Sequence, residues 1–302
     1  MNGLNTMLAG TLSYFPRWFV KPFARPYVAG ETFETAAAAV RTLNTAGFLA
    51  TLDILGEHVH SRTEAEAVRD AYTRLYRQIQ SEGLQSGISL KLTHLGLELD
   101  PDLARENLLQ VLEAARATHN FLRIDMENSP YTDATLDLYQ TCRSRYPRVG
   151  TVLQAYLHRT LADIQALGSA PLNVRICKGI YRESPQIAYQ DREEIRNNYV
   201  RAVQAVLNQG GFVAIATHDL PLIDRIEQWL VQEQIPTDRF EFQVLYGVPM
   251  QGKLEQLLEK GYTVRVYVPF GQAWFDYSIR RLKENPHIVG YVLKNLLTSA
   301  TG

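Results

Sequence analysis

The sequence predicts an α/β protein built as a closed (β/α)8 barrel, the TIM-barrel architecture. Eight short apolar segments rich in β-branched and aromatic residues recur along the chain, and longer amphipathic or Ala-rich segments separate them. No linker or low-complexity stretch interrupts this alternation. A doubly wound open sheet is the alternative, but it usually has fewer strands, and no G-x-G-x-x-G motif follows any of the apolar segments.

Composition narrows the class of protein. The 302 residues are 46% apolar, which is typical of a folded globular domain with a sizeable core. The formal net charge of -1 argues against nucleic acid as a partner. Two distant cysteines, Cys142 and Cys177, indicate a reducing compartment, so we expect a cytoplasmic protein. No run approaches the roughly 20 apolar residues that a membrane span needs.

Residues 1–46 are expected to form an N-terminal arm and a helix, and residues 47–302 the barrel. The first thirty residues contain no acidic residue, and the segment Phe15–Phe23 combines four aromatic with two basic side chains. This segment is interpreted as a packing arm; contact with a membrane surface and import into an organelle stay open as alternatives. An Ala-rich helix is predicted at Phe33–Ala46, ended by Gly47.

The strands and helices of the barrel follow in order. The predicted strands are Phe48–Leu55, Gly87–Leu92, Phe121–Met126, Val149–Ala155, Asn173–Lys178, Phe212–Thr217, Arg239–Leu245 and Tyr262–Val268. Helices are predicted at Thr63–Ser81, from the Asp100-Pro101 start signal to Ala117, at Thr132–Tyr146, from Gly179 to Asn208, and at Gln251–Lys260.

The last segment changes its period from two to that of a helix. Pro269 is predicted to end the eighth strand, and a helix begins at Trp274. Arg280 and Arg281 lie on this helix beside Tyr277, at helical spacing. Two adjacent guanidinium groups favour an anion between them, and a planar Arg fork matches a carboxylate, so we expect a carboxylate clamp. A solvated basic face is the alternative.

Polar side chains end the other strands, and in a barrel these carboxyl ends converge on one face. The candidates are Lys91, Asp125, Gln154, Arg175, Lys178, Thr217, His218, Leu245 and Tyr267. Arg175 and Lys178 are three residues apart, so they need a backbone irregularity to share a site, and Gly179 can supply it. Ordinary structural roles compete for several of them: a strand-end carboxylate for Asp125, a helix cap for His218 and core packing for Tyr267.

Several chemistries are compatible with these residues. An anionic substrate suits Lys91 and the two arginines, and a cofactor phosphate or an electron-rich ring suits Arg175 and Lys178. Hydride transfer would require a cofactor, because no side chain accepts a hydride. The alternatives are a metal hydrolase using His58, His60, Lys178 and His218, a Schiff-base lyase through Lys91 or Lys178, and a barrel that binds carboxylates without catalysis.

Eight stretches, taken in order, closely resemble the proline dehydrogenase family, in its short single-function bacterial type. They are LKLTHLG (Leu90–Gly96), RIDMENSPYTDATLDLY (Arg123–Tyr139), VLQAYLHRT (Val152–Thr160), VRICKGIYRE (Val174–Glu183), ATHD (Ala216–Asp219), FEFQVLYGV (Phe240–Val248), VRVYVPFG (Val264–Gly271) and YSIRRLKEN (Tyr277–Asn285). The resemblance implies a distorted barrel that binds FAD non-covalently, with its last helix over the barrel mouth and no metal.

The resemblance also assigns roles to individual residues. Lys91, Arg280 and Arg281 would hold the proline carboxylate, and Leu245, Tyr267 and Tyr277 would enclose the ring. Asp125 would orient the cationic group formed by Lys91, Arg280 and Arg281. The implied cofactor contacts are Gln154, Arg175, Lys178, Thr217, His218 and Glu284, and Tyr181 matches a tyrosine beside the active site.

The implied reaction is the first step of proline catabolism to glutamate. L-Proline would be oxidised to Δ1-pyrroline-5-carboxylate by hydride transfer from C5 to flavin N5, and a membrane quinone would accept the electrons. The aromatic arm would then touch the inner face of the cell membrane. A separate pyrroline-5-carboxylate dehydrogenase is left open as a partner.

Overall fold

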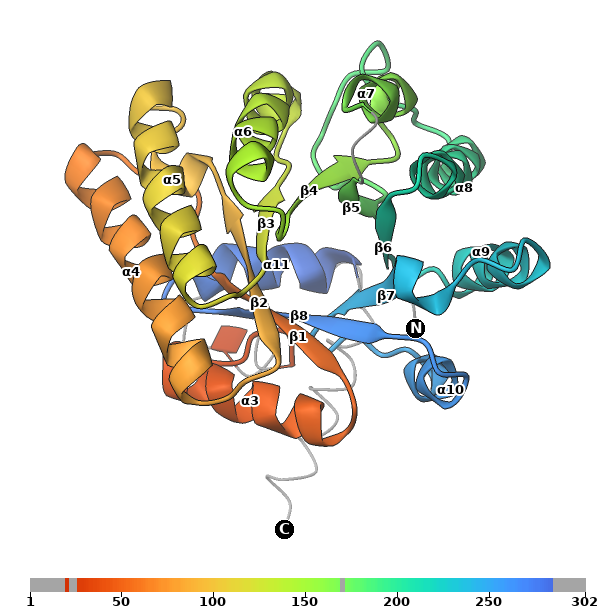
Figure 1. The fold of residues 1–302 in the computed structure, drawn as a ribbon, viewed down its shortest axis with the longest axis horizontal. Coiled ribbons are helices and arrows are strands. Elements are labelled where there is room, and N and C mark those ends of the chain that lie inside the picture. The colour runs from red at the N-terminus through yellow and green to blue at the C-terminus, as the bar shows by residue number, and fades with distance from the viewer. Residues whose placement is uncertain (1–19, 22–25, 169–171, 285–302) are drawn as a thin grey trace.

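The computed structural model describes residues 20–21, 26–168 and 172–284. Its centre is a closed barrel of eight parallel strands in sequence order, in which β8 pairs with both β7 and β1 (Figure 1). The predicted fold class is therefore confirmed.

Each predicted strand is present, within a few residues of its expected bounds. The strands are β1 (Leu49–Ile54), β2 (Ser86–Lys91), β3 (Leu122–Asp125), β4 (Val149–Gln154), β5 (Asn173–Cys177), β6 (Phe212–Ala216), β7 (Phe240–Leu245) and β8 (Val264–Phe270). The helices are α3 (Phe33–Thr45), α4 (Arg62–Ser81), α5 (Pro101–Ala117), α6 (Thr132–Arg145), α7 (Thr160–Ala166), α8 (Arg192–Asn208), α9 (Leu220–Gln232), α10 (Lys253–Glu259) and α11 (Trp274–Glu284).

Strand periodicity separates an apolar core from a polar barrel interior. In β3, Leu122 and Ile124 belong to the large apolar core. The alternate residues, Arg123 and Asp125, are also buried, but they bond to polar groups of β5, two strands away in the barrel. Because successive side chains point to opposite faces of a strand, the same period that builds the core also builds a column of polar groups inside the barrel.

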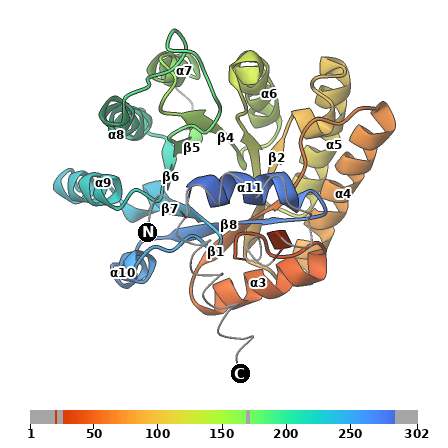
Figure 2. The same cartoon turned by 180° about the vertical axis from the view of Figure 1, so that it is seen from behind.

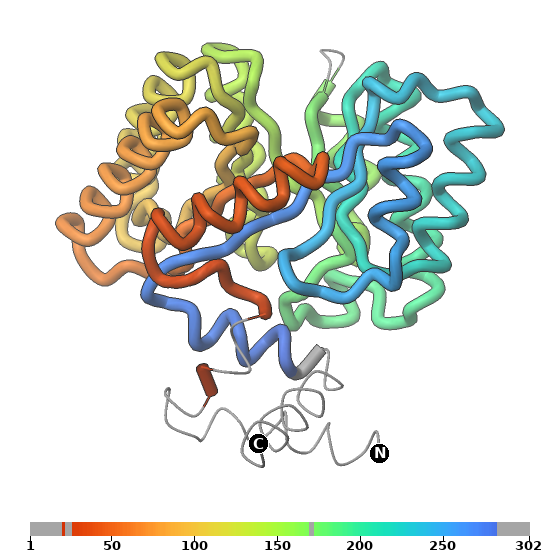
Figure 3. The backbone as a smooth tube through the Cα atoms, turned by 90° about the horizontal axis from the view of Figure 1, so that it is seen from below, coloured from red at the N-terminus to blue at the C-terminus, as the bar shows by residue number. Residues whose placement is uncertain are grey.

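The helix ring explains how α11 comes to cover the barrel mouth. In a regular barrel the helix after β8 packs beside β8 and β1. Here α3, which precedes β1, packs against both of these strands and takes that place. The last described helix, α11, instead crosses the end of the barrel, as Figures 1 and 2 show from opposite sides and Figure 3 from below.

Two local predictions were wrong. Pro269 does not end β8, which continues to Phe270. The last β7–β8 pair is Leu245 with Tyr267, and beyond it Ala29 N donates to Pro269 O at 2.9 Å, so proline stands where β8 has no β7 neighbour and no ladder N–H is needed. The helix expected directly after Gly179 begins only at Arg192.

The late start of α8 follows from its N-cap. Asp191 Oδ1 accepts hydrogen bonds from the backbone N–H groups of Glu193 and Glu194, at 2.8 and 3.0 Å. Since the cap satisfies N–H groups that have no partner within a helix, it fixes where the helix begins.

The described part of the N-terminal segment packs on α11. Val20, Tyr27 and Val28 form a small apolar cluster with Leu55 and with residues of α11. The predicted membrane contact through Phe15–Phe23 lies mostly outside the described residues. Within the described ranges, no helix has the length and apolar character required to span a membrane.

Candidate functional site

A pocket of about 660 Å³ opens at the carboxyl ends of the strands, beneath α11. It brings together nearly all the residues predicted from the sequence. Those that line it are Lys91, Asp125, Gln154, Arg175, Lys178, Tyr181, Thr217, His218, Leu245, Tyr267, Tyr277, Arg280 and Arg281. The remaining candidate, Glu284, is the last residue of α11, and its side chain lies outside the described part of the structure.

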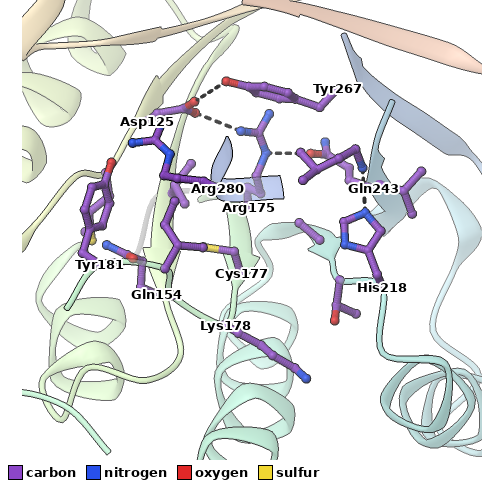
Figure 4. A pocket seen from close by; sticks show the side chains of 18 of the residues that line it. Asp125, Gln154, Arg175, Cys177, Lys178, Tyr181, His218, Gln243, Tyr267 and Arg280 are labelled. Carbon is purple, nitrogen blue, oxygen red and sulfur yellow. Dashed lines mark hydrogen bonds and ion pairs between the residues drawn. The ribbon is translucent and has the colours of Figure 1, made fainter. Parts of the chain in front are cut away.

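Arg175 forms the centre of the pocket floor (Figure 4). Its Nη1 donates to Asp125 Oδ1 at 2.9 Å, its Nε donates to Gln243 Oε1 at 2.6 Å, and its Nη2 donates to Ser89 Oγ at 3.0 Å. The guanidinium also lies 5.2 Å from the centre of the Tyr267 ring. Hydrogen bonds to three other strands and the Tyr267 ring of a fourth therefore hold this cation in one orientation.

Lys91 is held by Asp53, a carboxylate that was not among the predicted site residues. Its Nζ lies 3.1 Å from Asp53 Oδ2, and Tyr267 OH donates to the same oxygen at 2.7 Å. Burial alone would lower the pKa of Lys91, but the Asp53 and Asp125 carboxylates outweigh it and raise the pKa above the ordinary lysine value. Lys91 therefore stays protonated and offers no lone pair for a Schiff base.

Arg280 and Arg281 descend from α11 as the roof of the pocket. Arg280 Nη2 lies 2.9 Å from Glu57 Oε1, in the loop after β1. Arg281 is only 5% exposed, and its guanidinium lies 5.5 Å from the centre of the Tyr277 ring. The solvated basic face is therefore wrong for Arg281. Burial disfavours the ionised form of Glu57, yet the hydrogen bond and charge of Arg280 bring its pKa below the usual value.

The opposite end of the pocket carries Lys178 and His218. Lys178 pairs with Asp219, which also accepts from Arg196 Nε at 2.7 Å. Asp219, not His218, caps α9. His218 Nε2 accepts from Leu245 N at 2.9 Å, so its Nδ1 carries the proton and can donate to a ligand. Burial, helped by Arg281 and Lys178, lowers the pKa of His218 to about 4, which keeps the ring neutral.

Gly179 places Lys178 at the pocket. Its φ is +113°, a conformation that favours glycine, and an added Cβ would lie 2.2 Å from Cδ1 of Tyr156. This is the irregularity that the spacing of Arg175 and Lys178 required. On the neighbouring strand, Gln154 Nε2 donates to Glu127 O at 2.8 Å, which orients the Gln154 amide.

Sequence reasoning missed Asp53, Glu57 and Gln243. Gln243 lies two residues before Leu245 on β7, so strand periodicity assigns both to the same face. Asp53 and Glu57 stand near and just beyond the end of β1. The signal for them is the same as for the predicted residues, because the ends of all eight strands converge on one face of the barrel.

The two histidines considered as metal ligands, His58 and His60, contact different partners. His58 Nδ1 lies 2.7 Å from Glu98 Oε2, whereas the backbone N–H of His60 donates to Glu64 Oε2 at 2.7 Å. Among the described residues, no three His, Cys, Asp or Glu side chains gather in a way that could hold a metal ion.

Comparison with known proteins identifies the family. Residues 36–292 match the family profile described as proline dehydrogenase. The chain belongs to the proline dehydrogenase family. It is 38% identical over 274 residues to proline dehydrogenase 1 of Bacillus subtilis (strain 168), covering 91% of this chain and 90% of the relative. It is 35% identical over 279 residues to proline dehydrogenase of Deinococcus radiodurans, with 91% and 90% covered.

The fold of this family member is also found in a longer solved protein. The structure of proline utilization A (PutA) from Bdellovibrio bacteriovorus, inactivated by N-propargylglycine, superposes with a TM-score of 0.81 at 23% identity. The match covers 88% of this chain but only 33% of that protein, so the chain corresponds to about a third of its length.

Family membership establishes the class of reaction. The chain is an oxidoreductase with proline dehydrogenase activity, which performs the first step of proline catabolism, and it belongs to a family of flavoproteins. The resemblance read from the eight sequence stretches is confirmed, and the metal-hydrolase and carboxylate-binding alternatives give way to it.

Proposed function

We propose that this proline dehydrogenase binds FAD non-covalently and oxidises L-proline to Δ1-pyrroline-5-carboxylate. The observation that carries the proposal is the arrangement of the pocket, with Arg280 and Arg281 on α11 above a floor made by Arg175, Asp125 and Tyr267. Among the lining residues cations outnumber carboxylates, so the enclosed space favours anionic groups.

The substrate carboxylate is assigned to Arg280, Arg281 and Lys91. A guanidinium binds a carboxylate through two parallel hydrogen bonds, and both arginines come from one helix that covers the pocket. Arg280 already contacts Glu57. The substrate carboxylate must therefore displace Glu57 or share Arg280 with it. Lys91 contributes a charge whose position is fixed by Asp53.

The pyrrolidine ring is assigned to the space between Tyr267, Tyr277 and Leu245. Tyr267 and Leu245 are paired in register on neighbouring strands, so they present adjacent surfaces. Tyr277 closes this space from the roof and is itself buried. Asp125, fixed by Arg175 and Tyr267, orients the cationic groups around the substrate. Holding the ring in one pose aligns C5 for oxidation, and this positioning is the main contribution of the protein.

The other part of the pocket fits a flavin nucleotide. Val152, Cys177 and Ala216 line it with small or apolar side chains, which suit a flat ring system. Lys178 and Arg192 add cationic groups suited to phosphates. Further contacts are assigned to the polar residues Gln154, Arg175, Thr217, His218 and Glu284. Bound FAD would supply the acceptor, at N5, for the hydride that leaves C5 of proline.

The remaining expectations belong to the same proposal. Electrons pass from the reduced enzyme to a membrane quinone, and a separate pyrroline-5-carboxylate dehydrogenase can take up the product. The protein is cytoplasmic, residues 1–46 provide an arm and a helix that packs on the barrel of residues 47–302, and Phe15–Phe23 contacts the inner face of the cell membrane. Binding of quinone-containing vesicles by the full chain tests the membrane contact.

An absorption spectrum tests the core of the proposal. The purified protein should carry the flavin bands, release its FAD on denaturation, and lose the visible absorption when L-proline is added without oxygen. Mass spectrometry should then find a product lighter than proline by two hydrogens. A colourless protein that takes up no FAD, or a spectrum that proline leaves unchanged, would contradict it.

A further inference from the structure

The loop between β1 and α4 carries Glu57, the partner of Arg280, and both ends of this loop are fixed. At its start, Leu55 N donates to Phe270 O at 2.8 Å, which ties it to β8. At its end, the Glu64 carboxylate accepts from His60 N at 2.7 Å. The position of the Glu57 carboxylate therefore depends on what holds the middle of the loop.

His58 holds the middle of the loop. Its φ of +37° lies in the left-handed region, which is disfavoured for a residue with a side chain. Its ring Nδ1 lies 2.7 Å from Glu98 Oε2. A strained backbone conformation persists only where surrounding contacts determine it, so the contact with Glu98 fixes the conformation next to Glu57.

Glu98 is attached to a firm support. Its other oxygen, Oε1, accepts the hydroxyl hydrogen of Tyr131, at the start of α6. The loop that carries Glu98 is closed by its own hydrogen bonds, among them Leu97 N to Leu92 O and Asp100 N to Gly96 O, both at 3.0 Å. The hydrogen bond from Tyr131, aided by His58, holds the pKa of Glu98 below its usual value, so it is a carboxylate at neutral pH.

We propose that Glu98, together with Tyr131, is a positioning residue for substrate binding. Through His58 it holds Glu57 against Arg280 and thereby sets how firmly α11 closes over the pocket. Glu98 does not line the pocket among the described residues, so it acts through the loop and not by touching the substrate. The inference rests on the proposed role of Arg280 in binding the proline carboxylate.

The cluster joins three loops that follow successive strands. His58 follows β1, Glu98 follows β2 and Tyr131 follows β3, and all three loops lie at the end of the barrel that α11 covers. A loop fixed in this way presents Glu57 to α11 without a search through other conformations, which favours the closed position of the roof. Loss of the support should therefore weaken substrate binding more than it slows the chemical step.

The first test is Glu98→Ala in the full-length, FAD-loaded enzyme. We expect the KM for proline to rise about two- to fivefold, as for loss of a partly exposed charged contact, while kcat and bound FAD stay as in the wild type. Glu98→Gln keeps an acceptor oxygen and should show a smaller rise. Glu66→Gln, which removes an exposed carboxylate of α4 paired with Arg62, is the matched control. An unchanged KM in Glu98→Ala overturns the proposal.

Two further variants separate positioning from a general structural role. If Glu98 acts through Glu57, the double variant Glu57→Gln with Glu98→Ala should have the KM of Glu57→Gln alone, and additive effects would refute the pathway. His58→Gly removes both the backbone strain and the contact with Glu98. It should keep the thermal stability of the wild type yet raise the KM; a lower Tm with an unchanged KM indicates a structural role only.

Failure of the positioning role can be distinguished from failure of the proposed function. Reduction of the wild-type enzyme by saturating proline tests the function, and the comparison of KM between variants tests the positioning. If the wild type is reduced by proline and the KM values of all variants agree, only the positioning role is lost.

Discussion

The carboxylate of Asp53 lies 3.1 Å from the ammonium group of Lys91, and the hydroxyl of Tyr267 donates to the same oxygen at 2.7 Å. Tyr72 OH also donates to the other oxygen, at 3.2 Å. Asp53 is 1% exposed, so this carboxylate is a fixed hub beneath the site and not a solvent-exposed group. It orders one cation and one aromatic residue that the proposed function assigns to proline.

Replacement of Asp53 should be costly. Asp53→Asn leaves the charge of Lys91, whose side chain is 13% exposed, without its partner, and breaking such a largely buried pair costs about 3 kcal/mol of unfolding free energy. Urea denaturation measures the loss. The control is Asp70→Asn, because Asp70 pairs with Arg69 on α4 at the surface. Equal stability of the two variants would show that the Asp53–Lys91 pair adds nothing to the fold.

Arg281→Met tests the carboxylate clamp. A charged hydrogen bond contributes about 1.5–3 kcal/mol, so the KM for proline should rise by roughly ten- to a hundredfold. Bound FAD, read from the absorption spectrum, should be unchanged because the cofactor is assigned to the other part of the pocket. Arg201→Met, an exposed arginine on α8, serves as the control. A wild-type KM for Arg281→Met would remove the assignment.

Glu57→Gln tests what the Arg280 contact does. If the pair fastens α11 over the pocket, losing a partly exposed ion pair of about 1 kcal/mol should raise the KM about fivefold. If Glu57 instead only competes with the substrate for Arg280, the KM should fall. Steady-state kinetics at varied proline concentration distinguish the two, and we expect the rise.

Gly179→Ala should damage the cofactor end of the pocket. The added Cβ would overlap the Tyr156 ring at 2.2 Å, at a φ of +113°. Strain of this kind costs about 1–3 kcal/mol and would displace Lys178. We expect a lower Tm and reduced FAD content. Gly83→Ala is the control, because Gly83 also has a positive φ, +60°, but nothing lies within 4 Å of an added Cβ. Full FAD content in Gly179→Ala would contradict the prediction.

Acidification should destabilise the protein partly through His94. Burial, together with Lys91, lowers the pKa of His94 to about 4, whereas an unfolded histidine titrates near 6.5. Between these values the unfolded state binds the proton more readily, so stability is complete above about pH 6.5 and is lost as the pH falls toward 4. At pH 5 the uptake of a proton by His94 in the unfolded state lowers the free energy of unfolding by about 2 kcal/mol.

Thermal unfolding at pH 7.5 and pH 5 measures this contribution. His94→Gln cannot take up the proton, so its Tm should fall less on acidification than that of the wild type. His119→Gln is the control, because His119 is exposed in the turn after α5. An equal fall in wild type and His94→Gln would show that other groups account for the acid sensitivity.

Much of the barrel and of the site could be predicted because both depend on local periodicity. Strands show a period of two and helices a period near 3.6, and parallel strands bring their carboxyl ends to one face whatever their separation in the chain. For this reason Lys91, Arg175 and Tyr267, far apart in sequence, were expected in one pocket that they do line.

The order of the eight strands, the helices between most of them and the chemical character of the strand-end residues all follow from the amino-acid sequence. The partners that these residues take depend on the folded barrel. Asp53 holds Lys91, Glu57 holds Arg280, and α3 takes the place beside β1 and β8 that frees α11 to cover the mouth. The physical reason is that periodicity depends on residues close together in the sequence. An ion pair, or the position of α11 over the barrel, depends on distances that exist only after the barrel has closed.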